Sequence, residues 1–375
     1  MSVSFQGFIR SDGTAGTRNY VGIVSTVICS STVVRSIAKQ VPAAIPIVHT
    51  HGCAQLGDDL IQTKSTLAGV SANPNIGSVL LVGLGCETNQ VDELAAMIPQ
   101  DKPIRGIGIQ ALEGSNQTVS AGVEIAKKWA GEAAREKRQP MPLSSLSIGV
   151  IGLDSDEQAL CTAYPIIGRV VDRLLDYGAN IVVGLNRGIE PAGASLAQRA
   201  ADPVSARRLV KAAKGLYRRR WEKTGPGIAD AQGWTAAELE RAHREAVIVG
   251  SRPVAGVVSY GERPFQKGIH LMAVPDNPVE ALSGLAAGGC SMVLIVSSRG
   301  LLVGSVAVPC FVVAPAGTST PADDELVDCI VTGEDLDKEA EELIQNLLEV
   351  CSGCPTSLER LELGEFAISR VGTPF

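Results

Sequence analysis

The sequence has few aromatic residues and few histidines, and it contains no long apolar run. Aromatic residues make up 4% of the 375 residues, and only four histidines occur. The longest apolar runs, such as SVLLVGLG from Ser78, are much shorter than the roughly 20 residues that a membrane helix requires. No N-terminal stretch has the basic, apolar and small-residue pattern of a signal peptide. We therefore expect a cytoplasmic protein that does not insert into a membrane.

An excess of basic charge is also absent, because the net charge is −7 at pH 7. This charge argues against nucleic acid as a partner, since contacts with phosphates depend on lysine and arginine. Nine scattered cysteines in a chain of this length do not indicate a secreted disulfide scaffold, so reduced thiols are expected. The hydrophobic content of 45% is sufficient for a sizeable core in each of two domains.

Short runs rich in Val and Ile alternate with segments of helical period, which predicts β-α-β units with mainly parallel sheets. We therefore predict an α/β fold of two domains, residues 1–136 and 145–375, separated by a charged and then Pro- and Ser-rich linker. Polar helical sequence at about 200–248 predicts an insertion in the second domain. The expected strands are Tyr20–Thr26, Ile45–Val48, Ser78–Gly83 and Pro103–Gly108, then Leu146–Gly152, Ile181–Leu185, Val254–Ser259, Met292–Val296 and Cys310–Ala314.

Three loops after predicted strands combine small residues with polar side chains: HTHGCAQLGDD from His49, GLGCETNQ from Gly83 and GIQALEGSNQT from Gly108. Because the carboxyl ends of neighbouring parallel strands meet at one edge of a sheet, we expect the three loops to form one site. The first loop is either a metal or acid/base site, or a polar loop whose aspartates cap the next helix. For Cys53 and Cys86, an inert buried thiol and a ligand or reactive role both stay open.

The stretches GFIRSDGTAGTRNY, HTHGCAQLGDD, NPNIGSVLLVGLGCE and YGERPFQKGIHLM resemble the large, catalytic part of the altronate and galactarate dehydratase family. That family also includes the large subunit of sulfolactate sulfo-lyase. The resemblance implies a hydro-lyase that acts on a sugar acid, or a related hydroxy or sulfonated acid, and leaves a 2-keto-3-deoxy acid. It also implies a divalent metal, iron(II) or manganese(II). Members often carry a small SAF domain, so we expect a separate SAF-domain subunit as a partner, and a homo-oligomer.

The resemblance and the residue types together give a set of candidate site residues. His49, Cys53, Cys86 and Glu87 match the family patterns H-x-x-G-C and G-L-G-C-E and are the expected metal ligands. His49 or His51 is alternatively the acid that assists the leaving hydroxyl. Arg18 is expected to hold the substrate carboxylate with its planar fork, unless it pairs with acids of the fold. The other candidates are Asp156 as a base, and Asn19, Gln55, Gln110, Ser155, Arg263 and Lys267 as substrate-binding residues.

The second half departs from the family pattern at three places. IGLDSDE stands where the family has Q-C-G-G-S-D, so that Gly152 replaces the cysteine and only Ser155 and Asp156 are retained. No stretch like N-N-P-S-P-G-N-K occurs between residues 200 and 254. Ser305 and Val306 replace the cysteine and lysine of G-C-K-P-A-P-S.

These departures leave two hypotheses. The first is a metal-dependent lyase whose second half has been rebuilt for another substrate. In that case Asp156 and at least one of Arg263 and Lys267 should face His49 and Cys53 across a cleft between the domains. The second is a non-catalytic paralogue that binds a sugar acid or an active sister subunit, with Asp156 acting only as a helix N-cap.

Overall fold

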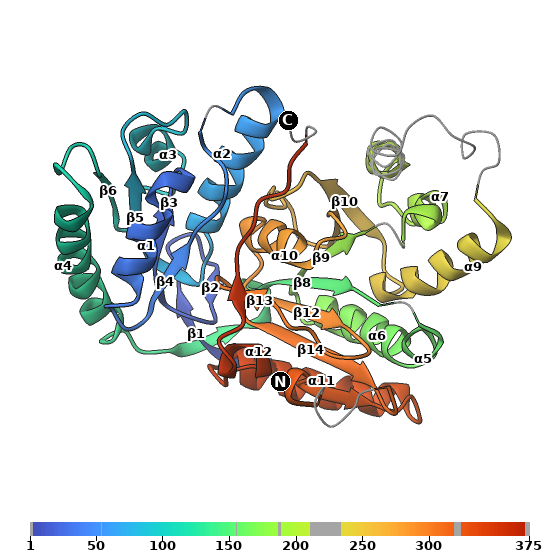
Figure 1. Ribbon diagram of the computed structural model, residues 1–375. Helices are drawn as coiled ribbons and strands as arrows, with labels where there is room; N and C mark the ends of the chain where they lie inside the picture. The colour runs from blue at the N-terminus through green and yellow to red at the C-terminus, as the bar shows by residue number, and fades with distance from the viewer. Residues whose placement is uncertain are drawn as a thin grey trace.

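The computed structural model describes residues 3–53, 55–154, 156–186, 189–210, 234–318 and 324–371. Two parallel sheets lie in separate halves of the molecule, and helices pack against both sheets (Figure 1). The predicted α/β fold with largely parallel sheets is therefore confirmed. In the described ranges, no helix is both long enough and apolar enough to cross a membrane.

The N-terminal sheet has four parallel strands in the order β4-β3-β5-β6. α1 and α4 cover one face of this sheet, and α2 and α3 cover the other. Because both faces are covered, β3 and β5 are almost entirely buried, which explains their continuous apolar sequence. The bounds are β3 Tyr20–Ser25, β4 Ala44–Ile47, β5 Ile76–Gly83, β6 Ile104–Gly108, α1 Ser31–Ala38, α2 Gly57–Ser71, α3 Val91–Ala96 and α4 Ser115–Ala133.

The C-terminal sheet has seven parallel strands in the order β10-β11-β9-β8-β12-β14-β15. The strands are β8 Ser147–Gly152, β9 Asn180–Leu185, β10 Val254–Val258, β11 Ile269–Ala273, β12 Met292–Val296, β14 Cys310–Pro315 and β15 Cys329–Val331. The chain moves in opposite directions from β8, first to β9 and later to β12. The crevice beside β8 is thus a place where sheets of this kind bind ligands.

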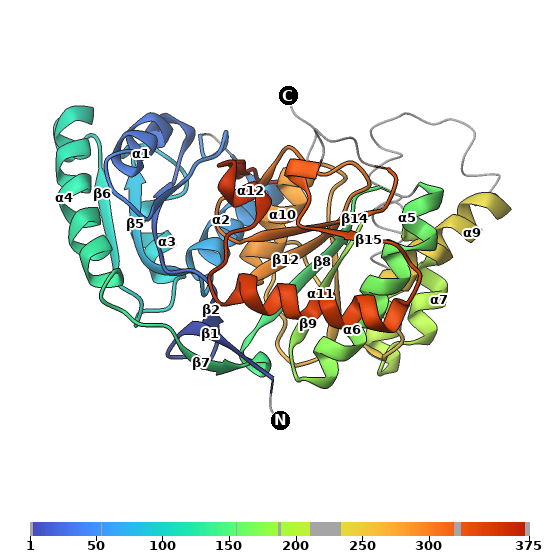
Figure 2. The same cartoon turned by 90° about the horizontal axis from the view of Figure 1, so that it is seen from below.

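The helices of the C-terminal half lie on both sides of its sheet. α6 and α11 pack on one face and α10 on the other, and Figure 2 shows α11 running beneath the strands. The helical segment between β8 and β9 is interrupted at Thr162, which separates α5 from α6. The helices are α5 Glu157–Cys161, α6 Ala163–Asp176, α7 Gly193–Gln198, α9 Ala236–Glu245, α10 Pro278–Ala287, α11 Leu336–Cys351 and α12 Ser357–Arg360.

Two small sheets complete the fold. β1 Ser4–Ile9 pairs antiparallel with both β2 Ala15–Gly16 and β7 Gln139–Pro142, so the segment expected to be a linker contains a strand. β13 Gly304–Ser305 pairs with β16 Gly364–Glu365 near the end of the chain. Of the expected insertion, residues 203–210 and α9 are helical, whereas residues 211–233 lie outside the described ranges.

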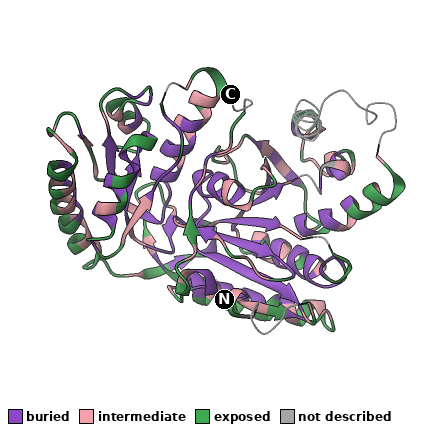
Figure 3. Ribbon diagram, viewed as in Figure 1, coloured by how far each residue is buried: buried purple, intermediate pink, exposed green. Residues whose placement is uncertain are grey.

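The two halves share an apolar interface. One core cluster contains Leu67 of α2 together with Leu282 and Leu285 of α10, so α2 packs against the other half of the molecule. Asn73 and Asn75 follow α2 and donate hydrogen bonds to backbone carbonyls before and after β12. Figure 3 shows the buried strands of both sheets between exposed outer helices.

Candidate functional site

The loops at the carboxyl ends of β3, β4 and β5 contact one another along one rim, the strand-end rim. η1 (Ile28–Ser30) follows β3 and lies between the other two loops. On one side, the Ile28 N–H donates to His51 O at 2.8 Å. On the other side, Thr26 Oγ1 donates to Glu87 Oε1 at 2.9 Å. The loop after β6 joins through Gln110 N–H, which donates to Leu84 O at 3.0 Å.

His49 is buried, and both of its ring nitrogens contact the backbone. Nε2 lies 2.8 Å from Ser25 O, and Nδ1 accepts the His51 N–H at 3.1 Å. This arrangement requires the tautomer protonated at Nε2. Burial lowers the pKa of His49 to about 4, so the ring is neutral at pH 7. As placed, His49 supports the loop and has no free nitrogen for a metal or a substrate.

The carboxylate of Glu87 also satisfies its own loop. It accepts the N–H groups of Leu84 and Gly85 in addition to the Thr26 hydroxyl. Cys53 and Cys86 are exposed. In the described part of the chain, no group of three or more His, Cys, Asp or Glu side chains is placed to hold a metal ion. The four expected ligands therefore do not form a metal site in this arrangement.

The two glutamines of the rim loops have different surroundings. The Gln55 amide oxygen accepts the Gly52 N–H at 3.2 Å, which closes the turn around Cys53. Gln110 is exposed, and its side-chain amide lies against Gly85, where an added Cβ would be 2.4 Å from Gln110 Oε1. Both side chains therefore stay at the strand-end rim, as expected from their loops.

A pocket of about 600 Å³ lies between the two halves, beside the rim; we call it the interdomain pocket. Its N-terminal wall includes Ser31, Arg35, His49 and His51, and its other wall includes Glu280 of α10. Residues 365–370 complete it. These residues belong to the C-terminal strap, residues 364–371, which runs between the halves toward α2 (Figure 1). The pocket therefore combines two arginines, two histidines and two carboxylates, including that of Glu365.

The strap is held to the N-terminal half by hydrogen bonds. His51 Nε2 donates to Ile368 O at 3.0 Å, and Arg370 donates to His51 Nδ1 at 3.3 and 3.4 Å. The Val371 N–H donates to Asp59 Oδ1 at 2.6 Å. Asp59 lies in the first turn of α2 and not at the N-cap, which is Leu56. The Nδ1 lone pair of His51 thus faces an arginine that lines the same pocket.

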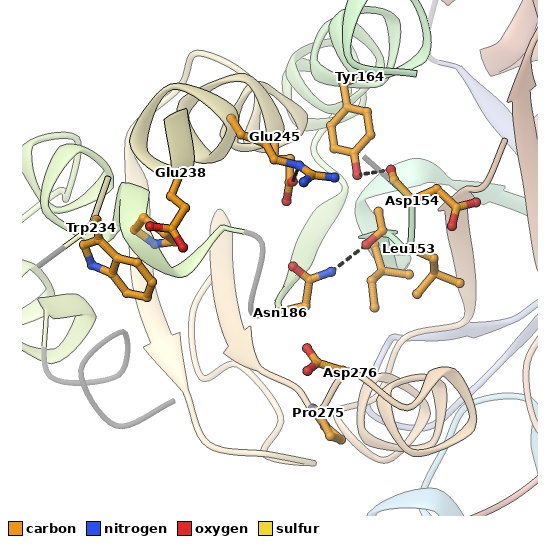
Figure 4. Close-up of a pocket in the computed structure, with 13 residues that line it drawn as sticks. Leu153, Asp154, Tyr164, Asn186, Trp234, Glu238, Glu245, Pro275 and Asp276 are labelled. Carbon is orange, nitrogen blue, oxygen red and sulfur yellow. Dashed lines mark hydrogen bonds and ion pairs between the residues drawn. The ribbon is translucent and has the colours of Figure 1, made fainter. Parts of the chain in front are cut away.

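A second pocket of about 370 Å³ lies at the carboxyl ends of β8, β9 and β11 (Figure 4). It is acidic, with Asp154, Glu238, Glu245 and Asp276 on its walls and Arg241 as the basic residue. Pro275 lines both pockets, so they adjoin each other. Tyr164 Oη donates to Asp154 O at 2.8 Å. An added Cβ at Gly152 would lie 2.1 Å from Tyr164 Oη. Tyr164 therefore occupies the space that a longer side chain at position 152 would need.

Arg18 and Asn19 lie at the opposite end of the N-terminal sheet from the rim, because they directly precede β3. Arg18 is buried and forms a bidentate ion pair with Glu359 at 2.7 and 2.8 Å. It also donates to three backbone carbonyls. Asn19 bridges Arg10 and Glu136. Pairing of Arg18 with an acid of the fold was the alternative left open by the sequence, and this geometry favours it.

The candidates of the second half do not come together. Asp156 is the N-cap of α5, accepts the Ala159 N–H at 3.0 Å and bonds to Ser298, whereas Ser155 lies outside the described residues. Arg263 pairs with Asp12, and Lys267 donates to Ser144 O. These contacts hold both cations near the amino ends of the strands, since the loop after β10 must return there before β11 begins. The expectation that Asp156 and at least one of Arg263 and Lys267 face His49 and Cys53 across a cleft between the domains is not met.

The structure adds two residues to the interdomain pocket that the sequence did not indicate: Arg35 and Arg370. Arg35 is the fifth residue of α1, and Arg370 lies in an irregular segment without a motif. Nothing in the sequence indicated that either arginine would line the same pocket as His49 and His51.

Comparisons with known proteins agree with the two halves of the fold. The family model described as D-galactarate dehydratase/altronate hydrolase, second domain, matches residues 7–134. The model described as D-galactarate/altronate dehydratase, C-terminal, matches residues 143–373. The chain belongs to the D-galactarate/altronate dehydratase family.

Members of the galactarate/altronate dehydratase family are similar to the chain over almost its whole length. The altronate dehydratase of Bacillus subtilis (strain 168) is 31% identical over 98% of this chain and 78% of that protein. The altronate dehydratase of Escherichia coli (strain K12) is 29% identical with the same coverage. The (2R)-sulfolactate sulfo-lyase subunit beta of Chromohalobacter salexigens is 24% identical over 98% of this chain and 97% of that protein. The chain is thus a member of a family of lyases.

Proposed function

We propose that the chain is a lyase that eliminates water from a small hydroxylated or sulfonated carboxylic acid bound in the interdomain pocket. The observation that carries this proposal is that Arg35 and Arg370 line the same 600 Å³ space as His49 and His51. The pocket is large enough for a sugar acid, and an arginine fork suits a carboxylate. The family membership supports elimination as the reaction. The proposed product is a 2-keto-3-deoxy acid.

His51 is the base in this proposal. Its Nε2–H donates to Ile368 O, which fixes the tautomer and leaves the Nδ1 lone pair on the pocket side beside Arg370. When Arg370 donates its hydrogen bonds to the substrate carboxylate instead of to His51, Nδ1 of His51 becomes free to accept a proton. This proton comes from the carbon next to the carboxylate. The C–O bond at the next carbon then breaks, and the hydroxyl leaves with the bonding pair and takes up the proton from His51 to form water. The enol that remains tautomerises to the keto acid.

The arginines lower the barrier by stabilising the negative charge that develops on the carboxylate as the proton leaves. His49 stays neutral and positions His51, because its Nδ1 accepts the His51 N–H. A divalent metal, iron(II) or manganese(II), remains a proposed cofactor and would act as a Lewis acid on the leaving hydroxyl. Since the four expected ligands do not form a site as placed, no step of the mechanism relies on them.

A non-catalytic paralogue is the second candidate. The presence of glycine at position 152 is the observation that favours it. The family has a cysteine at this position, and Tyr164 fills the corresponding space here. The same change is compatible with a lyase of different substrate specificity. The two candidates therefore differ in whether keto acid is formed, and not in whether an acid binds.

We also propose that the chain works with a second subunit and resides in the cytoplasm. One relative is named as subunit beta of a sulfo-lyase, which supports a subunit partner for this chain as well. A small SAF-domain protein and further copies of this chain are the proposed partners. Co-purification followed by mass measurement of the intact complex tests this proposal.

The test is an anaerobic screen of aldonic, aldaric and sulfonated acids, with iron(II) or manganese(II) added, that measures formation of 2-keto acid. Arg370→Lys and His51→Gln should each lower kcat/KM by about 100-fold, because a point charge cannot replace the fork and an amide cannot accept the proton. Arg252→Lys is the matched control, since Arg252 forms an exposed ion pair with Asp176. Binding of an acid without any keto acid would favour the paralogue.

A further inference from the structure

A further pocket, of about 460 Å³, lies among the helices of the C-terminal half; we call it the helix pocket. Its walls come from α6, α7, α9 and α11 and from η5 (Ala246–Val249). None of the described residues that line it also lines the interdomain pocket or the acidic pocket at the carboxyl ends of β8, β9 and β11. The proposed reaction therefore gives the helix pocket no role.

Arg199, which follows α7 and lines the helix pocket, has an incomplete set of hydrogen bonds. Its Nη2 donates to a backbone oxygen, Arg252 O, at 2.8 Å. Its Nε atom is buried and has no hydrogen-bond partner. A buried donor without a partner costs free energy, and in native proteins such a donor usually meets a water molecule or a bound ligand. The Nε–H group therefore indicates that an acceptor occupies the pocket.

The charge of Arg199 is also unbalanced. In the described part of the chain, no carboxylate forms an ion pair with its guanidinium. Burial lowers the pKa of Arg199, and the field of Asp172 opposes this shift from the same pocket. The Asp172 oxygens accept the N–H groups of Ser251 and Arg252 and the Ser251 hydroxyl, so their hydrogen bonds go elsewhere. An anion beside Arg199 would supply the missing counter-charge.

The rest of the lining decides which kind of anion fits. Leu196, Val247 and Leu336 give the pocket apolar surface. A ligand with an apolar chain would cover this surface and gain the free energy of its burial. The carboxylate of Asp172 would repel a second negative charge. The lining therefore suits a singly charged anion with an apolar chain better than a multiply charged ion such as phosphate.

We infer that the helix pocket binds an organic monocarboxylate with an apolar chain, whose carboxylate accepts a hydrogen bond from Arg199 Nε. A guanidinium presents parallel N–H groups that match the two oxygens of a carboxylate. The site is separate from the interdomain pocket, where the proposed function places a hydroxylated or sulfonated acid. The inference therefore does not rest on the proposed function.

α9 connects the helix pocket with the acidic pocket. His243 of α9 lines the helix pocket, whereas Glu238 and Arg241 of the same helix line the acidic pocket. A ligand that packs against one side of this ten-residue helix restrains the helix as a whole. Binding should therefore slow hydrogen exchange at the backbone amides of α9 and of η5.

The experiment titrates the full chain with sodium hexanoate and measures binding by calorimetry. Hexanoate should bind roughly tenfold more tightly than hexanamide, which has the same length but no charge, and roughly tenfold more tightly than acetate, which lacks the chain. Arg199→Met should weaken hexanoate binding by roughly tenfold, because the buried donor is removed. Arg105→Met, which changes an exposed arginine of β6 in the other half, should bind hexanoate as the unchanged chain does.

Hydrogen exchange locates the site in the unchanged chain, so the test does not depend on a variant. Protection confined to the interdomain pocket would overturn the inference, as would no binding of hexanoate below about 10 mM. Hexanamide that binds as tightly as hexanoate, or phosphate that binds more tightly, would do the same. Thermal unfolding shows whether Arg199→Met is folded, and a folded Arg199→Met chain with unchanged affinity would also contradict the site. A chain that binds hexanoate at α9 but converts no acid would contradict the lyase proposal alone.

Discussion

Arg18 shows how one side chain can serve the fold where the sequence allowed a catalytic role. Its guanidinium is buried, is paired with Glu359 and donates to carbonyls of both Thr17 and the C-terminal half. We predict that Arg18→Met and Glu359→Gln each lower the free energy of unfolding by about 3 kcal/mol, because either change removes the opposite charge from a group that is largely shielded from water. Urea unfolding measures the effect.

The double variant Arg18→Met/Glu359→Gln should lose less than the sum of the two single losses, since both remove the same interaction. The exposed pair Arg252–Asp176 provides the comparison, and Arg252→Met should cost less than about 1 kcal/mol. Additive losses at Arg18 and Glu359 would show that the pair is not coupled. A large rise in KM without a change in stability would restore Arg18 to a substrate-binding role.

His49 predicts a dependence of stability on pH. Burial lowers its pKa from 6.5 to about 4 in the folded protein, so only the unfolded chain takes up this proton between those values. The free energy of unfolding should therefore fall by up to about 3 kcal/mol as the pH drops from 6.5 toward 4. Urea unfolding at several pH values should show a smaller slope for His49→Gln, whose amide does not titrate. His243→Gln, at an exposed position, should keep the slope.

The site residues whose position the sequence predicts correctly are those that directly follow a predicted strand in the chain. Cys53, Cys86 and the HTH stretch follow apolar strands, and the structure places their loops on one rim because parallel strands end together. Arg370 could not be found this way, because it reaches His51 from more than 300 positions away through an irregular strap. Charge alone favours Arg263 and Lys267 as ligand-binding residues, but their loop returns to the amino end of β11, away from the rim.

Among the loops, the β4–α2 connection depends on glycine at one position in particular. We predict that Gly52→Ala is strongly destabilising, because its Cβ would lie 2.6 Å from Thr26 O and 2.9 Å from Val27 Cα. Gly57→Ala is the matched control: Gly57 also has a positive φ, +59°, but an added Cβ meets nothing within 4 Å. The control should cost only the backbone strain, about 1 kcal/mol. Thermal unfolding and hydrogen exchange at the Ile28 N–H measure the difference; equal effects would contradict the close contact.

Elements with uninterrupted apolar sequence were predictable, and short or mixed ones were not. β5 and β12 were expected within two residues of their observed bounds, since Val and Ile fill both faces of a covered parallel strand. β11, IHLMA, was not expected because His270 interrupts its apolar run, although the imidazole is fully buried. β1 and β7 depend on pairing between residues far apart in the chain, which local sequence does not show.

At the scale of the whole molecule, the shared core predicts that the two halves unfold together. Asn75 is fully buried and joins them: it accepts the Thr17 N–H and donates to Ser291 O and Ala307 O. We predict that the chain shows a single calorimetric transition and that Asn75→Ala lowers the free energy of unfolding by roughly 3 kcal/mol, because buried backbone groups lose their partners. Asn116→Ala, on the exposed first turn of α4, should have little effect. Two separate transitions in the unchanged chain would show that the halves are independent.

The C-terminal strap has a consequence for how the protein is made. A ribosome releases the N-terminal half first, and that half can form its sheet while the rest is still being synthesised. His51, however, has neither Ile368 O nor Arg370 beside it until the strap has left the exit tunnel, after every other element of the fold. The pocket wall is therefore completed after the other described elements, and the N-terminal half alone does not hold a finished pocket.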